Sequence, residues 1–393
     1  MVPNICFSWS RNALIEGLDV SLKWNLNLPQ GALKLPIKPI EKPKITQMKY
    51  PIKNKLIFLS LLGIMLTLLS CQPKEELRVL QFNIWQEGTV IPGGFDAIVE
   101  EIVRTDAHLV AFSEVRNYNK SNFNERIIAE LELRGLKFYG DKSYDSGLIS
   151  RYPIESYSAL YPVKDDHGSI TKARINVDGD VLAFYSAHLD YLNCSYYMPR
   201  GYSGNTWEEL AEPITDVADL LAVSRASKRD DAIKVFIEDA KEEIGQGSQV
   251  IIGGDFNEPS HRDWIAENKD LYDHKGVVIE WECTKLLEEA GFIDTYREQY
   301  PDPVKNPGFT YPSYNSRIAI DKLTWAPKSD ERERIDFIFY NKTSQLKLKD
   351  VVIVGPDASI VKSEVFVEDK DLFSKPTKVW PSDHKGLLAI FEY

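Results

Sequence analysis

The chain has 393 residues, of which 43% are hydrophobic and 27% are charged, an ordinary globular composition that excludes wholesale disorder, a fibrous repeat and a multispanning membrane protein. Residues 1–71 hold nine Lys and Arg against three acidic residues, so the net charge of −12 divides into +6 for this segment and −18 for residues 72–393. A body this acidic is poorly suited to following a polyanion by bulk electrostatics.

The N-terminal segment has the pattern of an export signal. A basic stretch runs from Met48 to Lys55, and the uncharged residues 56–70 separate it from Cys71. This run is shorter than the about 20 apolar residues of a membrane-spanning helix and is typical of a signal-peptide core. Together with Cys71 it resembles the bacterial lipoprotein box, in which the cysteine is lipidated and becomes the mature N-terminus. A buried helix or an uncleaved anchor is the alternative interpretation.

This pattern predicts four segments. We interpret residues 1–47 as an extension from a start codon placed too far upstream, 48–70 as a lipoprotein signal peptide, 71–76 as a tether and 77–393 as one folded domain. The mature protein is expected to be a monomer in the bacterial cell envelope, outside the cytoplasm and attached to the membrane through a lipid on Cys71.

Strand-like and helix-like patterns alternate in the folded part. Runs rich in Val, Ile, Phe and Tyr predict strands at 77–84, 108–113, 181–187, 249–253, 335–340, 351–355 and 387–393. Helical patterns cover 122–133, 281–290 and 215–244, and the last of these has Thr215 as its expected cap and Gly245 as its stop. Two sheets packed face to face, with helices outside, would bury these runs on both sides.

Two features between these elements stay open. Residues 191–213 are rich in Tyr and Trp and lack periodicity, so they either wall a substrate pocket or pack as an Ω-loop on their own aromatics. Cys194 and Cys283 are too few for a disulfide framework, and the sequence does not decide whether they pair. Neither has the spacing of a thiolate metal site.

Acidic, amide and histidine side chains recur where the predicted strands end. They are Asn83, Glu114, His188, Asp190, Asp255 and Asn257, with Asp336 inside a strand and Asp383 and His384 just before the last one. Carboxylate and amide oxygens suit Mg²⁺, Ca²⁺ or Mn²⁺ better than zinc, and histidine transfers protons near neutral pH. Together these groups are the parts for metal-assisted attack of water on a phosphoester.

The ordered series, together with SGLISRYPI at 146–154, resembles the endonuclease/exonuclease/phosphatase superfamily over about residues 77–393. That superfamily includes pancreatic-type deoxyribonucleases, abasic-site endonucleases, neutral sphingomyelinases and inositol-polyphosphate 5-phosphatases. The resemblance implies an α/β fold, a four-layer α/β/β/α sandwich of two mainly antiparallel sheets flanked by helices, with the active site at one end of the sheets. It also implies a metal, Mg²⁺ with Mn²⁺ or Ca²⁺ as alternatives, for which Glu114 is the principal ligand, Asn83 lies beside it and Asp383 binds or neighbours it.

The same resemblance implies roles for the remaining residues. Asp255 and Asn257 would orient the attacking water and hold phosphate oxygens, and His384 would face the phosphate with Asp336 hydrogen-bonded to its far ring nitrogen. His188, which abasic-site endonucleases lack, would protonate the leaving group or contact the phosphate. Whether Asp255 or His384 is the general base, and whether one metal or two is bound, stays open.

The function predicted from these observations is hydrolysis of a phosphodiester or phosphomonoester in a small or lipid-linked substrate. The first alternative is a secreted or surface nuclease acting on DNA or RNA, which the charge of −18 disfavours. The second is a catalytically inactive, ligand-binding lipoprotein, which the complete set of catalytic candidates disfavours.

Overall fold

A computed structural model describes residues 76–162 and 167–392 of the chain. The predicted upstream extension, signal peptide and lipidated Cys71 lie outside these residues, so those interpretations stay predictions. Within the described residues, none of the helices combines the length and the apolar character that crossing a bilayer requires.

Within residues 76–162 and 167–392, twelve strands form two six-stranded sheets of mixed parallel and antiparallel pairs, and two more strands form a hairpin. The first sheet has the order β13-β10-β14-β1-β2-β3, with β1 (Glu76–Asn83), β2 (Leu109–Val115), β3 (Asp145–Ser150), β10 (Lys347–Val354), β13 (Phe373–Ser374) and β14 (Gly386–Glu392). The second has the order β4-β5-β6-β7-β9-β8, with β4 (Ile154–Tyr161), β5 (Ser169–Val177), β6 (Asp180–His188), β7 (Gln249–Asp255), β8 (Phe292–Asp294) and β9 (Asp336–Asn341). The hairpin pairs β11 (Ala358–Val361) with β12 (Glu364–Val367).

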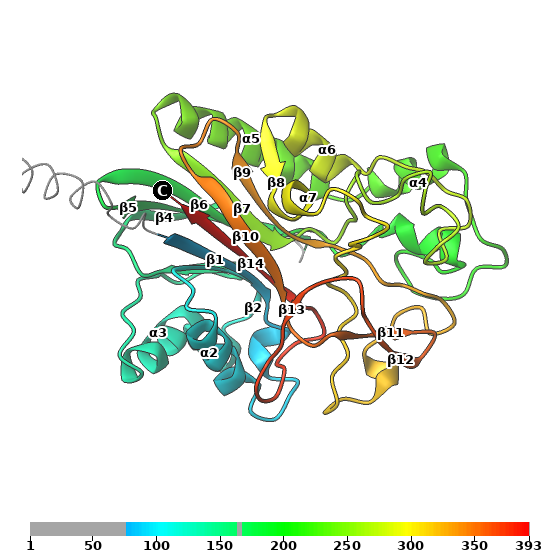
Figure 1. Ribbon diagram of the computed structural model, residues 1–393, viewed down its shortest axis with the longest axis horizontal. Coiled ribbons are helices and arrows are strands. Elements are labelled where there is room, and N and C mark those ends of the chain that lie inside the picture. Colours follow the sequence, from blue (N-terminus) through cyan, green and yellow to red (C-terminus); the bar gives the residue numbers. More distant parts are fainter. Residues whose placement is uncertain (1–75, 163–166, 393) are drawn as a thin grey trace, which may run out of the picture. The chain divides into compact units, whose positions relative to one another are not determined.

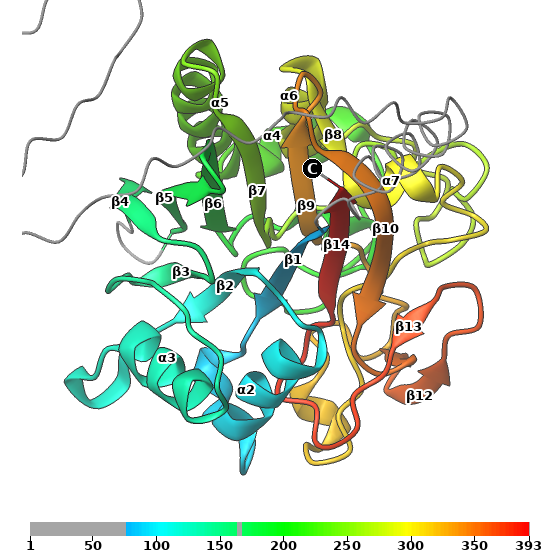
Figure 2. The same cartoon turned by 60° about the vertical axis from the view of Figure 1, so that its left-hand side comes forward.

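Helices cover the outer faces of both sheets (Figure 1). The α-helices are α2 (Gly94–Arg104), α3 (Phe123–Leu133), α4 (Val217–Ser224), α5 (Arg229–Gly245), α6 (Glu282–Glu289) and α7 (Thr295–Gln299). Four short 3₁₀ turns, η1 (Gln86–Gly88), η2 (Tyr118–Lys120), η3 (Ser195–Arg200) and η4 (Ile320–Lys322), lie in the loops. Figures 1 and 2 show α2 and α3 on one side of the paired sheets and α5 and α6 on the other.

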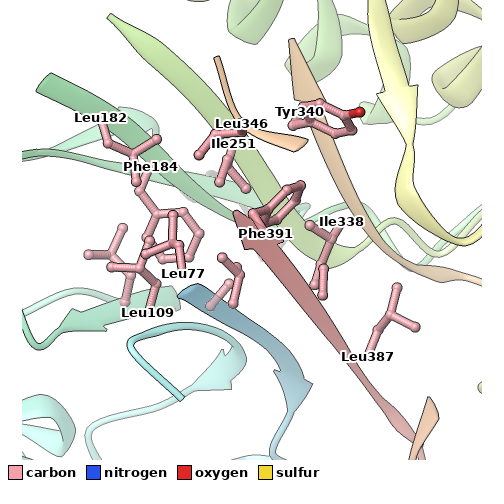
Figure 3. Close-up of a cluster of buried hydrophobic side chains, with 14 of the residues drawn as sticks. Leu77, Leu109, Leu182, Phe184, Ile251, Ile338, Tyr340, Leu346, Leu387 and Phe391 are labelled. Carbon is pink, nitrogen blue, oxygen red and sulfur yellow. The ribbon is translucent and has the colours of Figure 1, made fainter. Parts of the chain in front are cut away.

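The core divides into layers that match this arrangement. Apolar side chains from both sheets, among them Leu77, Phe184 and Phe391, meet in a buried cluster between the sheets (Figure 3). A second cluster joins the first sheet to α2 and α3, and a third joins the second sheet to α5 and α6. Because central strands such as β2 and β7 are covered on both faces, they are nearly continuous apolar runs instead of alternating ones. The predicted four-layer α/β/β/α sandwich is confirmed.

One predicted helix is wrong in extent. The pattern at 215–244 forms two helices, α4 and α5, and the carboxylate of Asp216, not Thr215, caps the first by accepting from two amides of its first turn. The chain breaks at the start of α5 because Asp190, from the loop after β6, accepts from the amide of Lys228 at 2.9 Å. A tertiary contact therefore replaces the local helical hydrogen bond at this point.

Candidate active site

The strand ends that carry the candidate residues meet at one end of the two sheets. In the β6–β7–β9 ladder His188 pairs with Asp255, which in turn pairs with Asp336. Ser113, at the end of β2, connects the sheets, because its hydroxyl donates to the carbonyl of Ala187 and accepts from the amide of Asp255. The register of both sheets thus brings together residues that lie up to 300 positions apart in the sequence.

A cavity of about 530 Å³ opens at this end. Aromatic side chains form much of its lining, and its charged and amide lining comprises Gln86, Glu114, Arg116, Asp145, His188, Asp255, Asn257, Asp383 and His384. Asn83 and Asp336 do not line the cavity. They lie behind it, fully buried, in hydrogen bonds with side chains that do.

Glu114 is aimed into the cavity by an irregularity in β2. The pairing of β2 with β3 shifts register between Ser113 and Val115, and Glu114 has a φ of 70°, in the left-handed region that is unfavourable for a side chain with a Cβ. One Glu114 oxygen accepts from the amide of Gln86 at 3.0 Å and the other from Asn83 Nδ2 at 3.2 Å. Such strain persists only where neighbouring contacts hold it, and it is typical of functional positions.

The residues around Glu114 fit a divalent cation. Asp383 Oδ1 is buried and has no hydrogen-bond partner within the described part of the chain. Burial raises the pKa of Asp383, and the nearby carboxylates of Glu114 and Asp255 raise it further, although the adjacent His384 opposes them. An orphaned buried oxygen among mutually repelling carboxylates is what an oxygen-seeking cation would relieve.

Asp255, Asp336 and His384 form a second acidic group, with one ligand atom of each within 4.8 Å of the others. Asp336 and His384 are hydrogen-bonded to each other, whereas the Asp255 oxygens accept from Asn83 Nδ2 and from the amide of Asn257. Asp336 Oδ2 pairs with His384 Nδ1 at 3.0 Å, and its Oδ1 accepts from Gln81 Nε2 at 2.7 Å. We therefore interpret Asp336 and His384 as an oriented imidazole, and the orphaned oxygen of Asp383 marks the neighbouring part of the cavity, beside Glu114, as a candidate metal site.

His188 has a similar carboxylate partner. Its Nδ1 lies 2.8 Å from Asp145 Oδ1, and Asp145 is also paired with Arg116 and accepts from Ser169 Oγ at 3.1 Å. Burial alone would lower the pKa of His188, but Asp145 outweighs it and raises that pKa to about 9. Burial likewise opposes the ionisation of Asp145, yet His188 and Arg116 lower its pKa to about 2.

Sequence reasoning missed Asp145. It stands immediately before SGLIS at 146–150, at the start of its strand, whereas candidates such as Glu114, His188 and Asp255 follow an apolar run and close their strands. Its φ of 69° and its position opposite the irregular part of β2 turn it toward His188. Only the long-range pairing of β3 with β2 reveals this arrangement.

Asp255 lies between the two imidazoles. Its Oδ2 is 3.9 Å from His188 Nε2 and 3.8 Å from His384 Nδ1, and it accepts a hydrogen bond from the side-chain nitrogen Nδ2 of Asn83 at 3.0 Å. Burial raises the pKa of Asp255, since the two histidines only partly offset the loss of solvent. For His384, burial acts downward on the pKa, but Asp336 and Asp255 raise it to about 10. Both imidazoles are thus held ready to carry positive charge beside the cavity.

Asn257 and Asp190 form hydrogen bonds that hold the main chain near the site. Asn257 lines the cavity, but its side-chain nitrogen donates to the carbonyl of Leu189 at 3.1 Å and its main chain has a φ of 50°. Asp190 is buried away from the cavity and organises the following loop by accepting from the amides of Leu192 and Lys228.

The structure also decides the two features that the sequence left open. Both interpretations of the segment 191–213 hold in part, since Tyr202 is buried in a local cluster whereas Tyr191 and Trp207 line the cavity. Cys194 and Cys283 are buried free thiols and do not pair.

The pattern of the endonuclease/exonuclease/phosphatase family matches residues 80–384, most of the chain and all of the site described above. The chain belongs to this family. Members of the family are hydrolases of phosphoester bonds, and this chain is accordingly a hydrolase acting on phosphoric esters.

Individual relatives are distant. An uncharacterized protein of Caenorhabditis elegans is 28% identical over 272 residues, which is 69% of this chain and 80% of the relative. An AP endonuclease from Archaeoglobus fulgidus has 16% identity and a TM-score of 0.46, covering 81% of this chain and 100% of its own. D. rerio TDP2 complexed with a single-strand DNA product has 14% identity and a TM-score of 0.45, again with 81% and 100% coverage.

Proposed function

We propose that this family member is a metal-dependent phosphoesterase that hydrolyses a small or lipid-linked phosphoester. The observation that carries this proposal is the pair of carboxylate-backed imidazoles, Asp145–His188 and Asp336–His384, that flank Asp255 at one cavity. An imidazole whose Nδ1 is held by a carboxylate has a fixed orientation and a stabilised charged form, which suits proton transfer and contact with phosphate oxygens.

Asn83, Glu114 and Asp383 would hold the divalent cation, Mg²⁺ in the first instance, and the cation would supply charge stabilisation at the phosphate. The side chains of the site then divide the remaining work. Asp255 and Asn257 orient a water molecule toward phosphorus, and His384 contacts a phosphate oxygen.

The reaction requires one bond to form and one to break. The water oxygen bonds to phosphorus as the bond between phosphorus and the alcohol oxygen breaks. The proton of the water passes to Asp255, since the raised pKa of His384 keeps that imidazole protonated, and the departing alcohol oxygen takes a proton from His188. Because both imidazoles and Asp255 lie at one cavity, no large movement of these side chains is needed.

The charge of the cavity favours a compact substrate over a long nucleic acid. Arg116 is the sole Lys or Arg among the described residues that line it, and Asp145 already pairs with that guanidinium. Duplex DNA carries one charge per about 1.7 Å and is usually bound through several cationic side chains. A nuclease remains the second candidate function, because the same catalytic groups would serve it.

A panel of phosphomonoesters, phosphodiesters, duplex DNA and single strands, assayed with the purified protein and Mg²⁺ at two salt concentrations, tests this proposal. We expect the highest kcat/KM for a small ester. If the kcat/KM for plasmid DNA is higher than that for every small ester and falls steeply as the salt concentration rises, the protein is a nuclease instead.

We also propose that the mature enzyme lies outside the cytoplasm, where a lipid on Cys71 attaches it to the membrane. The supports are the basic stretch, the uncharged run and the cysteine, in the order that a lipoprotein signal requires. Metabolic labelling with a fatty acid should mark the native protein and not the Cys71→Ser variant, and peptides from residues 1–47 in the native protein would contradict the predicted start at Met48.

A further inference from the structure

Three aromatic side chains form one side of the cavity. Tyr191 and Trp207 have ring centroids 6.5 Å apart with planes inclined by only 5°, and Trp207 and Trp325 have centroids 4.8 Å apart at 35°. All three line the cavity that also contains His188 and His384. We call Tyr191, Trp207 and Trp325 the aromatic platform.

The outer members of the platform are unusually exposed for their size. Tyr191 is 43% exposed and Trp325 is 52% exposed, whereas the neighbouring aromatic residues Tyr196 and Tyr202 are buried in the local core. An exposed tryptophan contributes little to packing, so stability of the fold does not explain why these rings stand in the cavity.

Hydrogen bonds nevertheless fix the main chain at each ring, and at Trp325 and Tyr191 the partner is a buried charged side chain. Both oxygens of the buried Glu331 accept from the amide of Trp325 at 3.1 Å, and Trp207 keeps a φ of 54° while its amide donates to the carbonyl of Ser203 at 3.0 Å. The buried guanidinium of Arg229 donates to the carbonyls of Asp190 and Leu192, on either side of Tyr191. The rings are therefore presented on a rigid frame, which lowers the entropy lost when a ligand binds them.

Resting on the function proposed above, we infer that the aromatic platform stacks against a planar ring in the organic part of the phosphoester, as a nucleobase would provide. The near-parallel planes of Tyr191 and Trp207 suit a planar ring, whereas a quaternary ammonium group is bound by aromatic faces that enclose it from several sides. A mononucleotide ester and the end of a single strand share this chemistry, and the experiment below separates them.

The test uses substrates that differ in the ring alone. The 5′-phosphate esters of adenosine and of 1-methoxyribose, each as a monoester and as a methyl diester, have the same reacting group. Stacking of one base is worth about 1–3 kcal/mol, so we expect kcat/KM to favour adenosine by about 5- to 150-fold. Trp325→Ala and Tyr191→Ala should each lower this preference by at least about fivefold, and Trp325→Phe should retain most of it.

Phe366→Ala is the matched control, because Phe366 is a 43% exposed aromatic on β12 that does not line the cavity. It should leave the preference for adenosine unchanged. Equal kcat/KM for the two sugars in the wild type, or a preference that survives both alanine changes at the platform, overturns the inference. A phosphocholine ester that is hydrolysed better than adenosine, with a preference lost in Trp325→Ala, also overturns it.

Binding without turnover separates this inference from the proposed function. In excess chelator, adenosine, which carries no phosphate, should quench the tryptophan fluorescence of the wild type saturably and that of Tyr191→Ala much less, whereas ribose should quench the fluorescence of neither protein. Quenching without hydrolysis of any ester would contradict the phosphoesterase proposal and support the platform. Absence of quenching overturns the platform even if esters are hydrolysed. If a short oligonucleotide has a higher kcat/KM than the mononucleotide, and Trp325→Ala removes this advantage, the stacked ring belongs to the end of a nucleic-acid strand.

Discussion

The two sides of the cavity are built by different means. The strand-end site, which comprises Glu114, His188, Asp255, Asp383 and His384, is fixed by sheet register and by carboxylates buried among strands. The aromatic platform stands on loops, and its main chain is fixed by side chains such as Arg229 and Glu331. A change at the strand-end site should therefore affect every substrate, whereas a change in the loops that carry the aromatic platform should affect stability or selectivity.

Removal of the divalent cation should have the largest effect, because the cation would neutralise the carboxylates of the strand-end site. We expect excess chelator to reduce hydrolysis of all esters to the background rate and Mg²⁺ or Mn²⁺ to restore it. Calorimetric titration of Mg²⁺ should show weakened binding in Glu114→Ala. Full turnover in chelator would exclude a metal-dependent step, and unchanged Mg²⁺ affinity in Glu114→Ala would exclude Glu114 as a ligand.

Loss of the imidazole of His188 or His384 should have the second-largest effect on turnover. His188→Ala and His384→Ala should each lower kcat by about 10²–10⁴-fold on ring-bearing and ring-free esters alike, since general acid–base steps contribute that much. The control is His108→Ala, because His108 lies next to the start of β2 and does not line the cavity. Near-normal kcat for His188→Ala over the whole panel would contradict its role as proton donor.

Changes to the side chains that fix the loops of the aromatic platform should lower the free energy of unfolding. Arg229→Met removes a buried cation that bonds three loop carbonyls and lies 3.8 Å from the buried Glu258, so we expect the free energy of unfolding to fall by about 3 kcal/mol. Lys234→Met, which removes an exposed cation of the same helix, should cost less than about 1 kcal/mol. Urea unfolding measures both, and equal effects would mean that Arg229 does not support the loop.

The pair formed by Asp145 and His188 predicts a pH window. The pKa of Asp145 is lowered to about 2, so its stabilisation is present above pH 4 and lost as the pH falls through 2. The pKa of His188 is raised to about 9, so its stabilisation is present below pH 6.5 and lost as the pH rises through 9. Between pH 4 and 6.5, the free energy of unfolding of the wild type should therefore be about 2 kcal/mol higher than that of Asp145→Asn.

Urea unfolding in chelator at a series of pH values would measure this difference. The gap between the two proteins should narrow on both sides of the window. A difference that does not vary with pH would show that Asp145 acts through packing alone and not through its charge on His188.

Much of the strand-end site was predictable because its signals are local. A strand is recognised from its own side chains, and Glu114, His188 and Asp255 stand where such runs end. The order of these residues along the chain, with Asp383 and His384 before the last strand, was enough to suggest the family and with it the layered fold. The pairing of His384 with Asp336, expected from the resemblance, is present at 3.0 Å.

Tertiary contacts decided what the local pattern could not. Asp145 supports His188 from 43 positions away, and Asp190 ends a helical pattern that the sequence alone would continue through residue 228. Residue type and the ends of apolar runs are local properties, so the sequence could predict the strands and the candidate residues that they carry. The partnership of Asp145 with His188 and the choice of aromatic rings that face the cavity could not be predicted in this way, because both depend on the register between strands and on loop contacts distant in sequence.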